Sequence, residues 1–142
     1  MTETAVELTA IEQTVRIAAT PETIWSFWTE PARLAEWLGA AEIAPEPGGL
    51  FRVAMENGHT MRGTFIELDP PHRLAMTFGW EQNEGQLVAP GTTRVDVTIT
   101  PDGDETVVLL RHSELPTTHA ADHSKGWQEL VCERLPAAVA SA

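Results

Sequence analysis

The chain has 142 residues, of which 42% are hydrophobic and 21% charged, and its formal net charge is -12 at pH 7. This length and composition fit one ordinary globular domain that can bury a core of its own. A surface this acidic repels the phosphates of nucleic acids and of anionic membranes, so we expect neither as a partner.

The same sequence gives expectations about location. Its single cysteine, Cys132, excludes an internal disulfide. Residues 1–10 lack the basic and apolar segments of a signal peptide, and no run of about 18 apolar residues predicts a membrane span. We therefore expect a cytoplasmic protein with a loose leader at 1–10 and a single domain at 11–142.

The first third of the chain predicts one strand and two short helices. Residues 11–17 alternate between apolar and polar side chains, which is typical of a half-buried strand. The Thr-Pro-Glu sequence at 20–22 supplies a cap, a first-position proline and a first-turn acid, and so predicts a helix over 21–29. Pro31 then breaks this helix, and a second one is expected over 32–37.

From residue 41 onward the hydrophobic pattern changes to period two, which predicts strands. Asn57-Gly58 and Asp102-Gly103 separate extended runs in the way that tight hairpins require, so consecutive strands should be antiparallel. The expected strands are 41–45, 50–56, 60–68, 73–80, 93–100 and 105–112. The side to which 60–68 turns its apolar residues stays open, because Phe65 and Ile66 point to opposite faces and a bulge could shift either.

The chain ends in a long helical pattern that runs from about residues 116–118 to Ala140. Pro136 lies inside this pattern and predicts a kink or an early stop. A sheet with one apolar face needs a cover, and this helix is the only expected element long enough to provide it. The fold class is therefore α+β, with a curved antiparallel sheet of six to seven strands wrapped on the C-terminal helix.

Several segments resemble a known family. They are Ile24-Trp25, Trp28-Thr29-Glu30-Pro31, Leu34-Ala35-Glu36-Trp37, Gly48-Gly49-Leu50-Phe51, the run from Leu68 to Leu74, His112-Ser113, and Gly126-Trp127 followed by Leu130. Together, over roughly residues 11–139, they resemble the bacterial activator-of-heat-shock-ATPase-homologue (AHSA)-like proteins of the START-like (SRPBCC) helix-grip superfamily. Leu38 departs from the family, which often repeats Trp at that position, and so does Pro136.

The resemblance implies a cavity between sheet and helix, because members of this superfamily bind lipids, hormones, polyketides or flavonoids. We therefore expect a small hydrophobic ligand, with no cofactor and no metal. The residues expected to line its site are Phe51, Val53, Met55, Phe65, Met76, Phe78, Trp80, Val95, Val97, Val108, Leu110, His112, Trp127, Leu130 and Val131. Each of these could equally be a core residue.

Two alternative functions stay open. Some superfamily members are cyclases, dehydratases or hydrolases, and here His112 could act as a general base and Arg62 could clamp a carboxylate if it turned inward. His119 and His123 have the i, i+4 spacing of metal ligands but no clear third partner, so we interpret them as polar residues at a helix start. The resemblance also suggests a protein-interaction role. A chaperone partner is disfavoured because the N-terminal domain of eukaryotic activators is not found here, whereas a homodimer remains an alternative.

Overall fold

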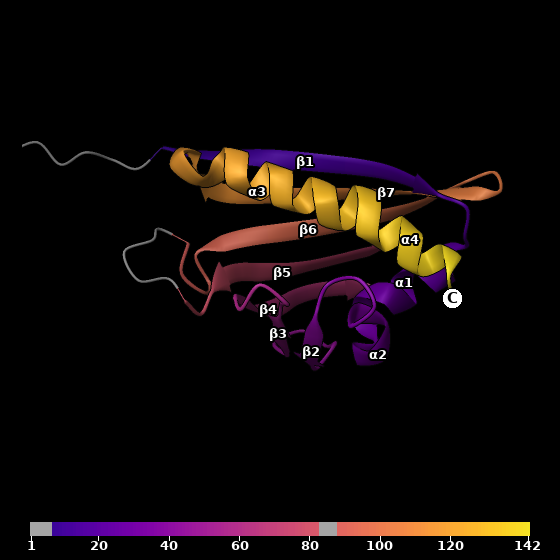
Figure 1. The fold of residues 1–142 in the computed structure, drawn as a ribbon, viewed down its shortest axis with the longest axis horizontal. Coiled ribbons are helices and arrows are strands. Elements are labelled where there is room, and N and C mark those ends of the chain that lie inside the picture. The colour runs from indigo at the N-terminus through magenta and orange to yellow at the C-terminus, as the bar shows by residue number, and fades with distance from the viewer. Residues whose placement is uncertain (1–6, 83–87) are drawn as a thin grey trace, which may run out of the picture.

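The computed structural model describes residues 7–82 and 88–142. The elements in chain order are β1 (Leu8–Ile17), α1 (Pro21–Thr29), α2 (Pro31–Leu34), β2 (Ala40–Ile43), β3 (Leu50–Ala54), β4 (Thr60–Asp69), β5 (Arg73–Trp80), β6 (Thr93–Asp102), β7 (Glu105–Pro116), the 3-10 turn η1 (Thr117–His119), α3 (Ala120–Trp127), the π-helical segment η2 (Gln128–Arg134) and α4 (Leu135–Ala140). Figure 1 shows the helix from α3 to α4 lying across one face of the sheet, with α1 and α2 near its α4 end.

The seven strands form one sheet in the order β1-β7-β6-β5-β4-β3-β2, and every neighbouring pair is antiparallel. The expected α+β fold, an antiparallel sheet covered by a long C-terminal helix, is confirmed. Two short helices follow β1 as expected, because Thr20 accepts a hydrogen bond from the Thr23 backbone N–H and Pro31 begins α2. The second helix ends at Leu34, before the expected end at residue 37, and the chain continues in a turn.

The first strand is longer than the local pattern indicates. β1 begins at Leu8, which pairs with Pro116 on β7, so residues 8–10 belong to the sheet rather than to a leader. The pairing is available because β7 continues four residues beyond the expected end at residue 112. The rest of the leader expected at 1–10 falls mostly on 1–6, which lie outside the described residues.

Two bulges decide which side chains face the helix. In β4 the register shifts between Phe65 and Glu67, so Phe65 is buried while Ile66 remains 40% exposed. This resolves the open assignment of 60–68. In β7 Glu114 has a φ of 58°, and the register with β1 shifts beside it, which returns Leu115 to the buried face.

Pro136 does not end the C-terminal helix. The helix continues to Ala140, because the residues before the proline change from α to π spacing. The Leu135 N–H donates to the Leu130 carbonyl five residues earlier, so the turn ahead of Pro136 is wider than an α-turn. The interruption expected here is thus a change of hydrogen-bond spacing, which accommodates the proline ring and its missing N–H.

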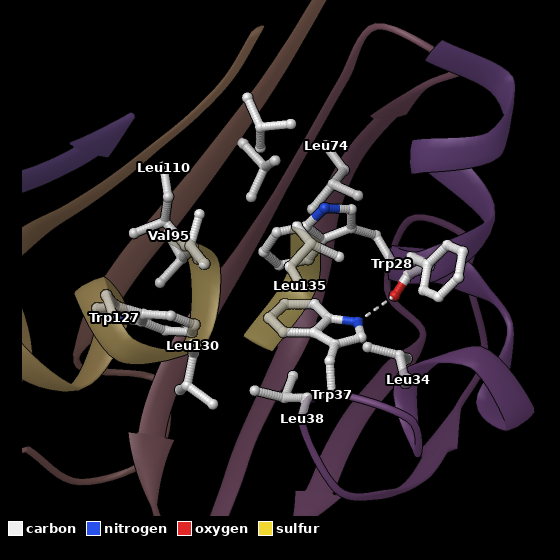
Figure 2. Packing of buried hydrophobic residues seen from close by; sticks show 14 of the residues in the cluster. Trp28, Leu34, Trp37, Leu38, Leu74, Val95, Leu110, Trp127, Leu130 and Leu135 are labelled. Atoms are coloured by element: carbon white, nitrogen blue, oxygen red, sulfur yellow. Dashed lines mark hydrogen bonds between the residues drawn. The ribbon is translucent and has the colours of Figure 1, made fainter. Parts of the chain in front are cut away.

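Part of the core lies where α1 and α2 meet the α4 end of the helix (Figure 2). Trp28 and Trp37 are fully buried with ring centroids 4.8 Å apart, and the Trp37 indole donates to the Phe27 carbonyl at 2.8 Å. Phe27 is fully buried as well. These three aromatic residues therefore offer no exposed surface to a partner protein.

Gly63 is required by a close approach between β4 and β5. A Cβ added there would lie 1.8 Å from the Thr77 carbonyl oxygen, whereas one added at Gly126 on α3 would meet nothing within 4 Å. We expect Gly63→Ala to lower the free energy of unfolding by about 3 kcal/mol through overpacking. Gly126→Ala should instead raise it by up to about 1 kcal/mol, because alanine favours helix. Denaturant unfolding of both variants checks this, and equal effects would contradict it.

Candidate functional site

A pocket of about 370 Å³ lies between the α3 end of the helix and the sheet. Its walls come from the segment joining β3 to β4, from β4 and β5, and from the helix. The lining residues are Met55, Asn57, His59, Met61, Phe78, Trp80, His119, Asp122, His123, Gly126, Trp127 and Leu130. Sheet and helix both contribute, so the pocket exists only once the helix is in place.

Half of the lining residues have apolar side chains, and many of these are aromatic. The Phe78 ring lies 5.3 Å from Trp80 and 5.7 Å from Trp127, measured between centroids, at steep interplanar angles. Three rings from a strand and a helix thus form a corner rather than a flat wall. Met55 and Met61 complete it with flexible, polarizable side chains that adapt to irregular shapes.

The first polar element of the site pairs an indole with an imidazole. The Trp80 Nε1–H donates to His123 Nε2 at 2.9 Å, and His123 Nδ1 lies 2.8 Å from the His119 carbonyl oxygen. Because Nε2 accepts, the ring proton must sit on Nδ1 and be donated to that carbonyl. Burial lowers the pKa of His123, so its imidazole is neutral at physiological pH.

The second pair lies deeper and belongs to a longer chain of hydrogen bonds. The Trp127 Nε1–H donates to His112 Nδ1 at 3.0 Å, which places the His112 proton on Nε2. Nε2 then donates to the Thr93 hydroxyl at 2.8 Å, and that hydroxyl donates to the Phe78 carbonyl at 2.7 Å. Every polar atom in this buried chain therefore has a partner.

These contacts bear on what the histidines can do chemically. His112 is fully buried and does not line the pocket, and both of its ring nitrogens are occupied by protein groups. Burial lowers its pKa to about 3. A general base needs a free nitrogen within reach of a substrate, so this geometry favours a structural role in which His112 orients Trp127.

The structure separates the fifteen expected ligand-contacting residues into two groups. Five of them line the pocket: Met55, Phe78, Trp80, Trp127 and Leu130. The others pack into the core: Phe51, Val53, Phe65, Met76, Val95, Val97, Val108, Leu110, His112 and Val131. Both groups lie on the inner face of the sheet or helix and so have the same periodicity in the sequence. A residue belongs to the core where neighbouring side chains cover it and to the pocket where they leave space.

Arg62, the other catalytic candidate, lies on the outer face of the sheet. Its side chain is 49% exposed and pairs with Glu81 at 3.1 Å. Glu81 also binds Arg52, which faces Arg62 across the β3–β4 pair. The bulge in β4 follows Phe65, too far along the strand to turn Arg62 inward.

The fifteen expected residues do not include seven that line the pocket: Asn57, His59, Met61, His119, Asp122, His123 and Gly126. One signal was available for two of them, because His119 and His123 have the spacing of one helix face, although we interpreted that face as solvated. Among residues 7–82 and 88–142, no three His, Cys, Asp or Glu side chains are grouped as a metal site would need. Within the same residues, no helix is long and apolar enough to cross a membrane.

Comparison with known proteins assigns the family. Residues 18–140 match the family described as "Activator of Hsp90 ATPase homolog 1-like protein". The chain belongs to this AHSA1-like family. Its resemblance to the family, first seen in short segments, is thereby confirmed over most of the sequence.

Solved structures share this fold, and one of them is 35% identical in sequence. The AHSA1-like protein of Rhizobium etli is 35% identical, with a TM-score of 0.74 over 98% of this chain and 87% of that one. A protein of Mesorhizobium loti is 20% identical, with a TM-score of 0.79 over 96% of this chain and 98% of that one. DynU16, a protein in the dynemicin biosynthetic locus, is 22% identical with a TM-score of 0.81 over 93% of this chain, which spans only 47% of DynU16. No curated protein matches the sequence.

The buried neutral state of His112 predicts a pH-dependent stability. In the unfolded chain this imidazole takes up a proton below about pH 6.5, whereas in the folded protein it does so only near pH 3. Stability contributed by His112 is therefore lost as the pH falls through this window, by about 2 kcal/mol between pH 7 and pH 5. Denaturant unfolding at both pH values should show this loss in the wild type, and a smaller loss in His112→Gln.

The exposed His72 offers a control for this measurement. His72→Gln should keep the wild-type difference between pH 7 and pH 5, because contributions from other groups are common to both proteins. An NMR titration in which the His112 imidazole of the folded protein gains its proton near pH 6.5 would contradict the prediction.

Proposed function

We propose that this AHSA1-like protein binds a small, largely apolar molecule in the pocket between the α3 end of the helix and the sheet. The observation that carries the proposal is the lining itself: Met55, Met61, Phe78, Trp80, Trp127 and Leu130 surround a volume of about 370 Å³. Sites for small molecules are typically concave, mostly apolar and of this size range.

The internal hydrogen bonds of the lining strengthen this interpretation. Both indole N–H groups at the pocket, from Trp80 and Trp127, are already bound to imidazoles. Their rings can therefore contact an apolar ligand without leaving a buried donor unpaired. Binding therefore leaves these two indole–imidazole hydrogen bonds in place.

The two alternative functions receive less support from the described residues. The enzyme hypothesis depended on His112 or Arg62 facing a cavity, and these residues lie in a closed hydrogen-bond chain and on the outer face respectively. Exposed aromatic residues would have favoured the interaction hypothesis, but Phe27, Trp28 and Trp37 are fully buried.

Gly126 provides a direct test of ligand binding. It lines the pocket, and a Cβ added there meets nothing within 4 Å, so a larger side chain would extend into the pocket without straining the helix. We expect the wild type to bind N-phenyl-naphthylamine, an uncharged fluorescent probe, with enhanced emission. Gly126→Leu should weaken binding by at least about tenfold, because its four added carbon atoms occupy the ligand's space.

Two control variants make the result specific. Gly126→Ala adds only one methyl group and should bind the probe within about twofold of the wild type. Ala121→Leu adds an apolar side chain to the exposed side of the same helix and should have no effect. Unchanged binding in a folded Gly126→Leu protein, or no binding by the wild type, would refute the proposed site.

A further inference from the structure

The described lining of the pocket has an acidic side chain but no lysine or arginine. Asp122, an exposed residue in the first turn of α3, is the only acidic residue among the described lining residues, and none of these is a lysine or arginine. The segments outside the described residues, 1–6 and 83–87, contain no lysine or arginine in their sequence either. The described lining therefore offers no guanidinium or ammonium side chain to an anionic ligand, and Lys125, about one turn after Asp122 on α3, is exposed and is not a lining residue.

The histidines do not change this balance. His123 is neutral, since its Nε2 accepts from Trp80 and its Nδ1 donates to a carbonyl. His112 lies behind the lining, and its imidazole is likewise neutral. His59 and His119 are the other histidines of the lining. Asp122 is the one carboxylate among the described lining residues.

The aromatic corner adds a second feature that favours a cation. Phe78, Trp80 and Trp127 contribute three aromatic rings to the lining, and the face of such a ring attracts an ammonium group. The Trp80 and Trp127 N–H groups, the positive edges of these rings, point to His123 and His112. The net charge of -12 also raises the local concentration of cations around the whole protein.

We propose that the ligand is a small organic cation, an amine or quaternary ammonium group carried on an apolar body. The body would lie against the rings and Leu130, and the positive group would lie toward the Asp122 carboxylate. This inference rests on the proposed function and specifies its ligand class. Carboxylates of the same shape should be disfavoured, because the lining gives them a like charge and no cationic partner.

Three probes with the same skeleton test the charge preference: phenylpropylamine, phenylpropanol and phenylpropanoate. Each is titrated at pH 8 against protein loaded with N-phenyl-naphthylamine, and displacement of the fluorescent probe reports its affinity. We expect the amine to bind on the order of five times more tightly than the alcohol, the scale of one partly exposed ion pair. The carboxylate should bind more weakly than the alcohol.

Asp122→Asn isolates the carboxylate that the inference names. It should bring the amine to within about twofold of the alcohol while leaving the alcohol's own affinity unchanged. Glu129→Gln removes the same charge from an exposed position of the same helix that does not line the pocket, and should keep the fivefold preference. This comparison separates a local contact from the general attraction of an acidic protein.

The outcomes distinguish the two proposals. If the alcohol or the carboxylate binds as tightly as the amine, the cation inference is overturned while the pocket keeps its ligand-binding role. If Asp122→Asn and Glu129→Gln reduce the preference equally, the local contact with Asp122 is overturned. If neither N-phenyl-naphthylamine nor any of the three probes binds, the proposed function itself fails, and the inference fails with it.

Discussion

One chain of buried hydrogen bonds determines where the C-terminal helix lies on the sheet. It starts at Trp127 on the helix, passes through His112 on β7 and Thr93 on β6, and ends at the Phe78 carbonyl on β5. An unpaired buried donor or acceptor is costly. A shift of the helix along the sheet would break these hydrogen bonds and leave buried polar groups unpaired, which apolar packing alone would not penalise. The same chain orients Trp127 and holds Phe78 in place, and both residues line the pocket.

The two ends of the helix differ in how the space above the sheet is filled. At the α4 end, Trp28 and Trp37 pack beside Leu135 and leave a closed core (Figure 2). At the α3 end, Gly126 contributes no side chain, and the remaining space is bounded by methionines and aromatic rings. The distribution of bulky side chains along the chain therefore places the pocket at one end of the helix.

The paired indoles and imidazoles give this pocket its chemical character. Trp80 and Trp127 each donate to a histidine, so both indole N–H groups are satisfied within the protein. The described lining consequently offers aromatic rings, thioethers and one carboxylate, Asp122, beside Asn57, His59 and His119. The nitrogens of His112 and His123 are all engaged by protein groups, so these two imidazoles are suited to orienting the indoles rather than to acid–base chemistry.

Local patterns in the sequence determined the elements of this protein and the faces they bury. Proline and threonine placed α1, and period-two alternation placed the strands. The predicted inner face of β5 to β7 is buried as expected. These signals could be interpreted because they depend on residues close together in the chain. Only the tertiary structure decided the bulge at Ile66, the start of β1 at Leu8 and the π spacing before Pro136, since each depends on a partner strand or turn. It also decided which inward residues line the pocket. Val97 and Trp80 follow the same alternation, but whether a side chain meets open space depends on what distant segments place opposite it.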